Sequence, residues 1–383
     1  MLKRELDFNH IFLIVVIGSI LPSPGFLSLS GRYLIQVIYF IFVTLFLFHR
    51  NGFSLRLHYW RLIALSVIPF FIALTLNLTT ISNAQDVFRE LIKFIFFPIL
   101  FFILWERGRN SSVKLPERQI ERFVVFCLFI QSVFVILQFF DFSRGLLNIF
   151  YGVEKLSANT DFTKRVRYMG SFENPNYLGF FVCSLLCFYL SIVSRKSNSF
   201  IIILALSVML ILLSGSRTSL LAAMALFLLY FRRLAPLIFL LIMVFFGSYL
   251  YELILSIKRL AVFSSWDALI NSHSFSERIK LLESFAFFWK EKFIFGHFQS
   301  PLKVVDNFIA LQMLRYGLFY WLSIVLIFYC IKPPVKVIIY FSVFFLIFSL
   351  TGAFFDNFRL LLIFLCLFVI ASTQSQKEIG PLT

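Results

Sequence analysis

The first group of residues that could do chemistry lies where a polar stretch leads into an apolar one, at Arg167, Gly170 and Asn174-Pro175-Asn176. Pro175 disfavours the α conformation at Asn174 and is well suited to the first turn of a helix. The pattern predicts that backbone N–H groups at a helix start lie near Arg167, an arrangement that binds anions. Arg167, Asn174 and Asn176 are therefore candidate ligands of a phosphate group. A plain helix start with solvated arginines is the structural alternative.

A second group, Ser214-Gly215-Ser216-Arg217, joins two apolar tracts. Asn198 to Phe231 provides 34 residues for two membrane spans and their turn, where about 40 would be expected. The turn is therefore predicted to lie within the outer edge of the membrane, shielded by protein. An arginine at that depth is costly and is usually functional or paired. Arg217 is thus a candidate phosphate ligand, with the Ser216 hydroxyl and Gly215 allowing close approach.

The third group lies in the longest polar segment, from Tyr251 to Asp306. Ser274 and Glu277 predict a capping box at the start of an amphipathic helix. Arg278 falls on the apolar stripe of that helix, together with Leu282, Phe285 and Trp289. An interfacial helix with such an arginine is suited to clamping a lipid phosphate. Snorkelling of the side chain toward water is the alternative.

Asp306, at the start of the next apolar tract, is a candidate general base, because its carboxylate would lie at the mouth of a span. The alternative is a helix cap, a common place for aspartate. A continuous helix would place Asp306 on one stripe with Gly317 and Tyr320 and would place Arg315 on the opposite face.

Two further sets of charged residues lie at the ends of apolar tracts. Arg89 and Lys93 are one helical turn apart, beside Asp86 and Glu90. They are suited either to holding a phosphate or to forming a charged cap with those acids. Asp356 and Arg359, three positions apart, favour a structural salt bridge.

The elements that must position these residues are hydrophobic. The chain is 60% apolar, has 55 phenylalanines and has a mean hydropathy of +0.91, which excludes an ordinary soluble domain. A spanning helix needs about 20 mostly apolar residues. We therefore expect residues 1–383 to form one all-α polytopic domain, surrounded by membrane lipid. Twelve spans are predicted, at about 10–28, 33–48, 60–77, 90–105, 122–140, 176–194, 199–214, 217–231, 234–251, 305–330, 335–350 and 355–372.

The net charge of +16 must be divided by position, because basic residues also set membrane topology. With the N-terminus inside, the short outer connections are nearly free of charge. Two long outer loops, 141–175 and 252–304, hold twelve of the 35 basic residues. Cations on this disfavoured side predict an anionic ligand and not a nucleic acid. The alternative is that long loops are translocated whatever their charge.

Several chemistries are excluded by missing motifs. The sequence has no P-loop, dinucleotide-binding glycine turn, His-Glu-x-x-His or Gly-x-Ser-x-Gly. It also lacks the Asp-x-Asp pair that holds the metal ion in a nucleotide-sugar site. Neither a metal nor a cofactor is therefore predicted. The five cysteines all lie in apolar tracts and are expected to be core residues.

Taken together, these residues resemble the bacterial O-antigen ligase and polymerase family of membrane glycosyltransferases. Three groups carry the resemblance: Arg167 to Asn176, Ser214 to Arg217, and Ser276-Glu277-Arg278 in the large loop between the ninth and tenth spans. The ligase pattern, His-(Asn/Ser/Gln)-x9-Gly-x-x-(Gly/Thr/Tyr), is similar to Asp306-Asn307 followed by Gly317-Leu318-Phe319-Tyr320.

The resemblance implies a GT-C-like fold in the bacterial inner membrane, with the active site facing the periplasm. It implies transfer of a glycan from undecaprenyl pyrophosphate without metal, with a chain-length regulator protein as a further partner. Arg217 and Arg278, assisted by Arg167, would hold the leaving pyrophosphate. Asp306 stands where ligases have histidine, which favours a polymerase that extends another lipid-linked repeat unit. A ligase acting on a lipid or protein acceptor, or a flippase of the same lipid-linked glycan, is the alternative.

Overall fold

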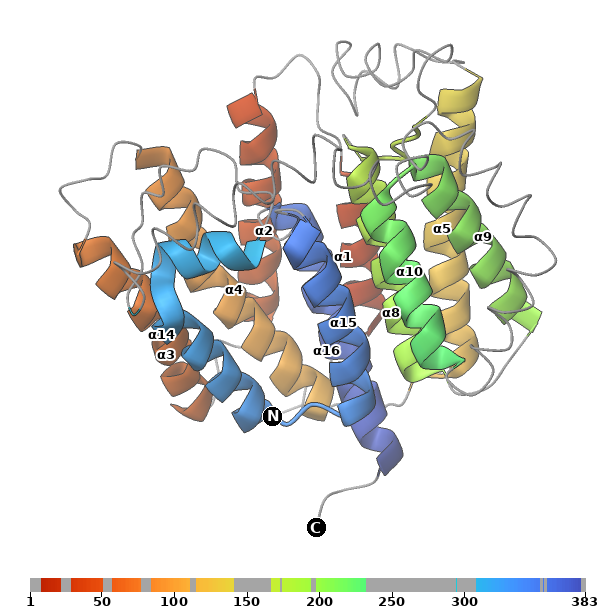
Figure 1. Ribbon diagram of the computed structural model, residues 1–383. Helices are drawn as coiled ribbons and strands as arrows, with labels where there is room; N and C mark the ends of the chain where they lie inside the picture. Colours follow the sequence, from red (N-terminus) through yellow and green to blue (C-terminus); the bar gives the residue numbers. More distant parts are fainter. Residues whose placement is uncertain are drawn as a thin grey trace, which may run out of the picture.

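The computed structural model describes residues 8–21, 29–50, 57–76, 84–110, 115–140, 167–172, 174–193, 198–231, 294, 308–351, 354 and 357–379 (Figure 1). Every regular element in these ranges is a helix, and none of them is a strand. The helices are α1 (Phe8–Ile20), α2 (Leu29–Arg50), α3 (Leu57–Leu76), α4 (Ala84–Asn110), α5 (Glu117–Phe139), α8 (Pro175–Ile192), α9 (Asn198–Ser214), α10 (Arg217–Tyr230), α14 (Phe308–Ile331), α15 (Val335–Thr351) and α16 (Phe358–Ile379).

The prediction of an all-helical protein built from apolar helices is confirmed. Eleven of the twelve predicted tracts coincide with these helices, and the tract at 234–251 lies outside the described residues. Within the described residues, three helices are long and apolar enough to cross a membrane, namely Glu117–Phe139, Pro175–Ile192 and Phe358–Gln376. Twelve spans therefore stay a prediction. The loops 141–175 and 252–304 lie mostly outside the described residues.

Contacts between helix ends fix the directions of several helices. Gln119 Nε2 donates to Asn9 Oδ1 (2.9 Å), so α1 and α5 start at the same end of the bundle. Leu115 N donates to Gln374 Oε1 (2.9 Å), which places the last turns of α16 at that end too. α16 therefore runs antiparallel to α1 and α5. In Figure 1 this is the lower end, and α16 begins at the opposite, upper end.

The centre of the bundle is formed by α8 and α16. Nearly every residue of α8 and of α16 as far as Ser375 is buried. Helices that are apolar on all sides are suited to such a position. Phe180 of α8, for example, lies against the rings of Phe344, Phe348 and Phe354, with centroids 4.9–5.6 Å apart. The upper ends of these two central helices carry the polar contacts described below.

A small residue lets α8 approach α10 closely. A Cβ atom built on Gly179 would lie only 2.7 Å from the Cβ of Ser219, and closer still to its hydroxyl. Small residues at helix contacts are common in membrane bundles because they let backbones approach. We expect Gly179→Ala to lower the free energy of unfolding by about 1–3 kcal/mol through overpacking. Thermal unfolding of the purified protein in detergent measures this loss.

Gly18→Ala in α1 is the matched control. The nearest atom to a Cβ at Gly18 is 3.5 Å away, on Ile363, which is an ordinary contact. This variant should keep the wild-type unfolding midpoint. Equal midpoints for the two variants would contradict the close α8–α10 contact.

Candidate functional site

Arg167 joins two of the three groups of residues singled out in the sequence. Its Nε donates to the carbonyl oxygen of Ser214 at the end of α9 (2.9 Å). Its Nη2 donates to Asn176 Oδ1 in the first turn of α8 (2.7 Å). The guanidinium is half-buried, and both of these bonds hold it in place. Arg167 therefore connects the start of α8 with the turn between α9 and α10.

The turn itself is shaped to accept the Arg167 side chain. Gly215 has a positive φ of +57°, which glycine adopts without the steric cost of a side chain. A Cβ at Gly215 would lie 3.2 Å from Arg167 Cγ and 3.3 Å from Arg167 Nε. Ser214 Oγ accepts from Ser216 N (3.2 Å) and donates to the carbonyl oxygen of Ile211 (2.7 Å). The arginine thus lies directly against a turn that is held by its own serines.

Two of the predicted phosphate ligands are helix caps. Asn174 Oδ1 accepts from Asn176 N (2.9 Å) at the start of α8, where Pro175 takes the first helical position. Ser216 Oγ accepts from Ser219 N (3.4 Å) at the start of α10 and is buried. The predicted helix start at Pro175 is therefore confirmed. The side-chain oxygens of Asn174 and Ser216 satisfy backbone donors that would otherwise be unpaired.

Positively charged groups of two kinds, helix N-termini and arginines, lie at this point. The N-termini of α8 and α10 both lie beside Arg167, because that side chain contacts Asn176 and Gly215. Arg217 is half-buried at the first position of α10. Helix N-termini carry a partial positive charge, which adds to the charge of the two guanidinium groups. We refer to Arg167, Asn176, the turn 214–216 and Arg217 as the arginine site.

A buried arginine lies deeper in the upper end of the bundle. Arg359 is 2% exposed and donates through Nε to the Gly18 carbonyl and through Nη2 to the Ser19 carbonyl. Nη2 also donates to the carbonyl oxygen of Ser171 (3.3 Å). Its Cζ lies 4.2 Å from the centre of the Phe172 ring, a cation–π distance. Asp356, its predicted ion-pair partner, lies outside the described residues.

Lys93 is the described member of the predicted cation pair on α4. It is buried, and its Nζ lies 5.7 Å from the centre of the Phe358 ring at the start of α16. The side chains of Arg89, Asp86 and Glu90 lie outside the described part of the chain. The structure thus places Lys93 near the start of α16 and leaves its pairing with Arg89 a prediction.

The helix that follows Asp306 is not continuous, which corrects one prediction. Gly317 has φ 67° and ψ −168°, so α14 breaks into two halves that run in different directions (Figure 1). Residues before and after Gly317 therefore do not share the single stripe expected from Asp306 to Tyr320. The reason is that glycine alone adopts this backbone conformation readily. Asp306 and Arg278 themselves lie outside the described residues.

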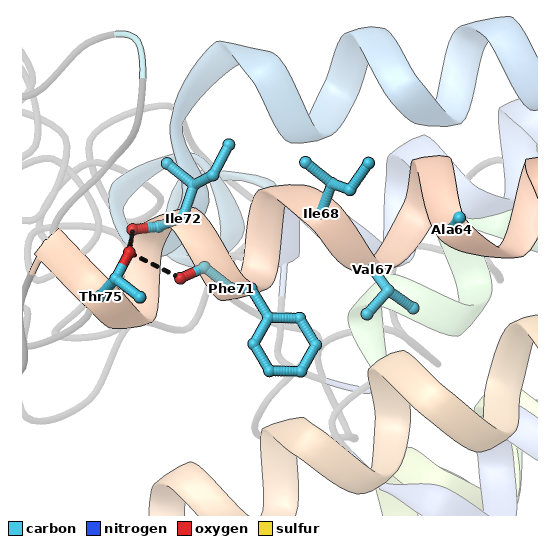
Figure 2. Close-up of a pocket in the computed structure, with 6 residues that line it drawn as sticks. All are labelled: Ala64, Val67, Ile68, Phe71, Ile72 and Thr75. Carbon is cyan, nitrogen blue, oxygen red and sulfur yellow. Dashed lines mark hydrogen bonds between the residues drawn. The ribbon is translucent and has the colours of Figure 1, made fainter.

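Neither of two hollows in the described surface coincides with a predicted site residue. An open apolar groove of about 380 Å³ runs along α3. Figure 2 shows the residues that line it, Ala64, Val67, Ile68, Phe71, Ile72 and Thr75. A second groove of about 400 Å³ lies between α5 and α9 and includes Glu121 and Arg122. In the described part of the chain, no three His, Cys, Asp or Glu side chains lie together as a metal site would require.

Sequence reasoning missed the glutamines that hold the Arg167 segment. Gln131 and Gln138 are buried in α5, and each bonds to the connection between Met169 and Ser171. Their signal is two amides seven residues apart, which is two turns on one face of an otherwise apolar helix. Burial within this segment also raises the pKa of the Tyr168 phenol above its ordinary value.

Comparison with known proteins gives no neighbour for the chain. No known family matches its sequence, and neither a curated protein nor a solved structure is significantly similar to it.

Proposed function

We propose that this protein is a membrane glycosyltransferase that polymerises glycan repeat units carried on undecaprenyl pyrophosphate. The observation that carries the proposal is the contact of Arg167 with both Asn176 and the Ser214 carbonyl. It brings two sequence groups of the resemblance to one cationic place at one end of an apolar bundle. A lipid-linked pyrophosphate matches that place, because its anion would meet the arginines while its isoprenoid chain stays beside apolar helices.

In this proposal the arginines act on the leaving group. An acceptor hydroxyl oxygen attacks the anomeric carbon of the donor glycan, and the bond between that carbon and the pyrophosphate oxygen breaks. The bonding electrons leave with undecaprenyl pyrophosphate, and the hydroxyl proton passes to a base, for which Asp306 is proposed. Arg167 and Arg217, with Arg278, stabilise the charge that develops on the pyrophosphate. Positioning and charge stabilisation together supply most of the rate.

Reconstitution tests the proposal directly. Purified protein in proteoliposomes, given the lipid-linked repeat unit without nucleotide, is expected to produce a ladder of glycan lengths. The same repeat unit on undecaprenyl monophosphate is the matched control and should give no ladder, because it lacks the pyrophosphate leaving group.

Two other products would contradict a polymerase. Transfer of one glycan to a lipid or protein acceptor would indicate a ligase. Movement of the unchanged lipid-linked glycan across the bilayer would indicate a transporter.

A further inference from the structure

The connection that carries Arg167 passes through the interior of the bundle. Residues 168–172, between Arg167 and the start of α8, are all buried. This segment is irregular, so its backbone groups cannot bond within a helix. Buried backbone groups away from water need partners, most strictly in a membrane protein. The partners of this segment therefore determine where it lies.

Two glutamines of α5 provide many of these partners. Gln138 Oε1 accepts from Met169 N (3.0 Å), and Gln138 Nε2 donates to the Gly170 carbonyl (3.3 Å). Two helical turns earlier on α5, Gln131 Oε1 accepts from Ser171 N (2.9 Å), and Gln131 Nε2 donates to Ser171 Oγ (2.8 Å). Each amide thus uses both its donor and its acceptor on the segment 169–171.

The segment is shaped to lie close to these amides. Gly170 has a positive φ of +60°, and a Cβ at this position would come within 2.5 Å of Gln131 Oε1. A side chain here would therefore push the segment away from α5. Ser171 Oγ also donates to the Ser19 carbonyl. The segment is held on one side by α5 and on the other by the end of α1.

The position of Arg167 follows from these contacts. Tyr168 N donates to the Leu213 carbonyl (3.0 Å), next to the Ser214 carbonyl that accepts from Arg167. Met169, the next residue, is held by Gln138. A shift of the segment away from α5 would therefore move the Arg167 backbone relative to the α9–α10 turn. Displacements of about 1 Å in positioned groups have large effects on catalysis.

We propose that Gln131 and Gln138 are positioning residues that set the affinity of the arginine site for the pyrophosphate of the lipid-linked donor. They act through the segment 169–171 and so through Arg167. This inference rests on the proposed function, because it takes the pyrophosphate as the ligand.

The test measures binding of undecaprenyl pyrophosphate to the full-length protein in detergent, by native mass spectrometry or tryptophan fluorescence. Gln138→Leu is expected to raise the Kd about tenfold. Gln36→Leu is the matched control, since Gln36 is a buried amide of α2. It should leave the Kd unchanged. If Gln138→Leu does not fold, Gln138→Glu takes its place in the test. Glutamate keeps the size of the side chain but loses the bond donated to the Gly170 carbonyl, so this variant should also weaken binding about tenfold.

A double-mutant cycle separates positioning from a general loss of structure. In an Arg167→Ala background, Gln138→Leu should cause no further loss of binding, because the residue through which it acts is gone. Additive losses would overturn the inference, as would a wild-type Kd for folded Gln138→Leu or Gln138→Glu. In both cases binding by the wild type would leave the proposed function standing. Absence of binding by the wild type itself would overturn both.

Discussion

Arg167→Ala is expected to lower the rate of glycan polymerisation about 100-fold or more, since losing one preorganised donor to a developing anion costs this much in other enzymes. The guanidinium is held by the Ser214 carbonyl and by Asn176, so it does not have to reorganise during the reaction. Alanine removes both the charge and the link between α8 and the α9–α10 turn. The initial rate of ladder formation in proteoliposomes measures the effect.

Two companion variants locate the cause of this loss. Arg167→Lys keeps the charge but not the planar fork, so its rate should fall between those of wild type and Arg167→Ala. Arg118→Ala removes an exposed arginine at the start of α5, at the lower end of the bundle, and should leave the rate unchanged. Arg167→Ala with more than half of the wild-type rate would show that the arginine site does not bind the leaving group.

Features set by local chemistry could be predicted from the sequence. The helix start at Pro175 follows from the proline, which is suited to the first helical position. Asn174, which was predicted as a phosphate ligand, caps this helix. The turn at 214–217 follows from a short polar break between two apolar tracts, and α9 and α10 end and begin there. In both cases the deciding residues are neighbours in the chain.

Features set by distant contacts could not be predicted in this way. The break of α14 at Gly317 was not predicted because the apolar tract continues on both sides of it and glycine is frequent in membrane spans. Arg359 bonds to carbonyls 341 and 188 positions away, whereas sequence spacing pointed only to the nearby Asp356. Gln131 and Gln138 bond to backbone groups. Because nearly all residues have the same backbone groups, the sequence does not show which of them a side chain contacts.

Arg359→Met is expected to destabilise the protein by about 1–3 kcal/mol, the cost of leaving a buried hydrogen-bond acceptor without its donor. The last carbonyl groups of a helix have no partner within the helix. Arg359 bonds to two such groups, those of Gly18 and Ser19 at the end of α1. Methionine has a similar length but no donor, so the Gly18 carbonyl would lose its bond to Arg359 and the Ser19 carbonyl would keep only the bond from Ser171 Oγ. Thermal or SDS-induced unfolding in detergent measures the loss.

Arg109→Met, at an exposed arginine in the last turn of α4, is the control and should change stability by less than about 0.5 kcal/mol. Arg359→Lys keeps the charge but cannot spread donors over three carbonyls as a guanidinium does, so its stability should be intermediate. If Arg359→Met and Arg109→Met had the same unfolding midpoint, the carbonyls of Gly18 and Ser19 would not depend on Arg359 as their hydrogen-bond donor.

The dipoles of two helices explain why a cation at position 359 is stable. Arg359 is in the first turn of α16, where the positive end of that helix disfavours it. Its guanidinium lies at the end of α1, where the negative end of the α1 dipole favours it, and also over the Phe172 ring. The third bond, to Ser171, attaches the same charge to the segment that carries Arg167. Loss of Arg359 should therefore lower the activity of the surviving folded protein as well as its stability, measured as the polymerisation rate per folded molecule.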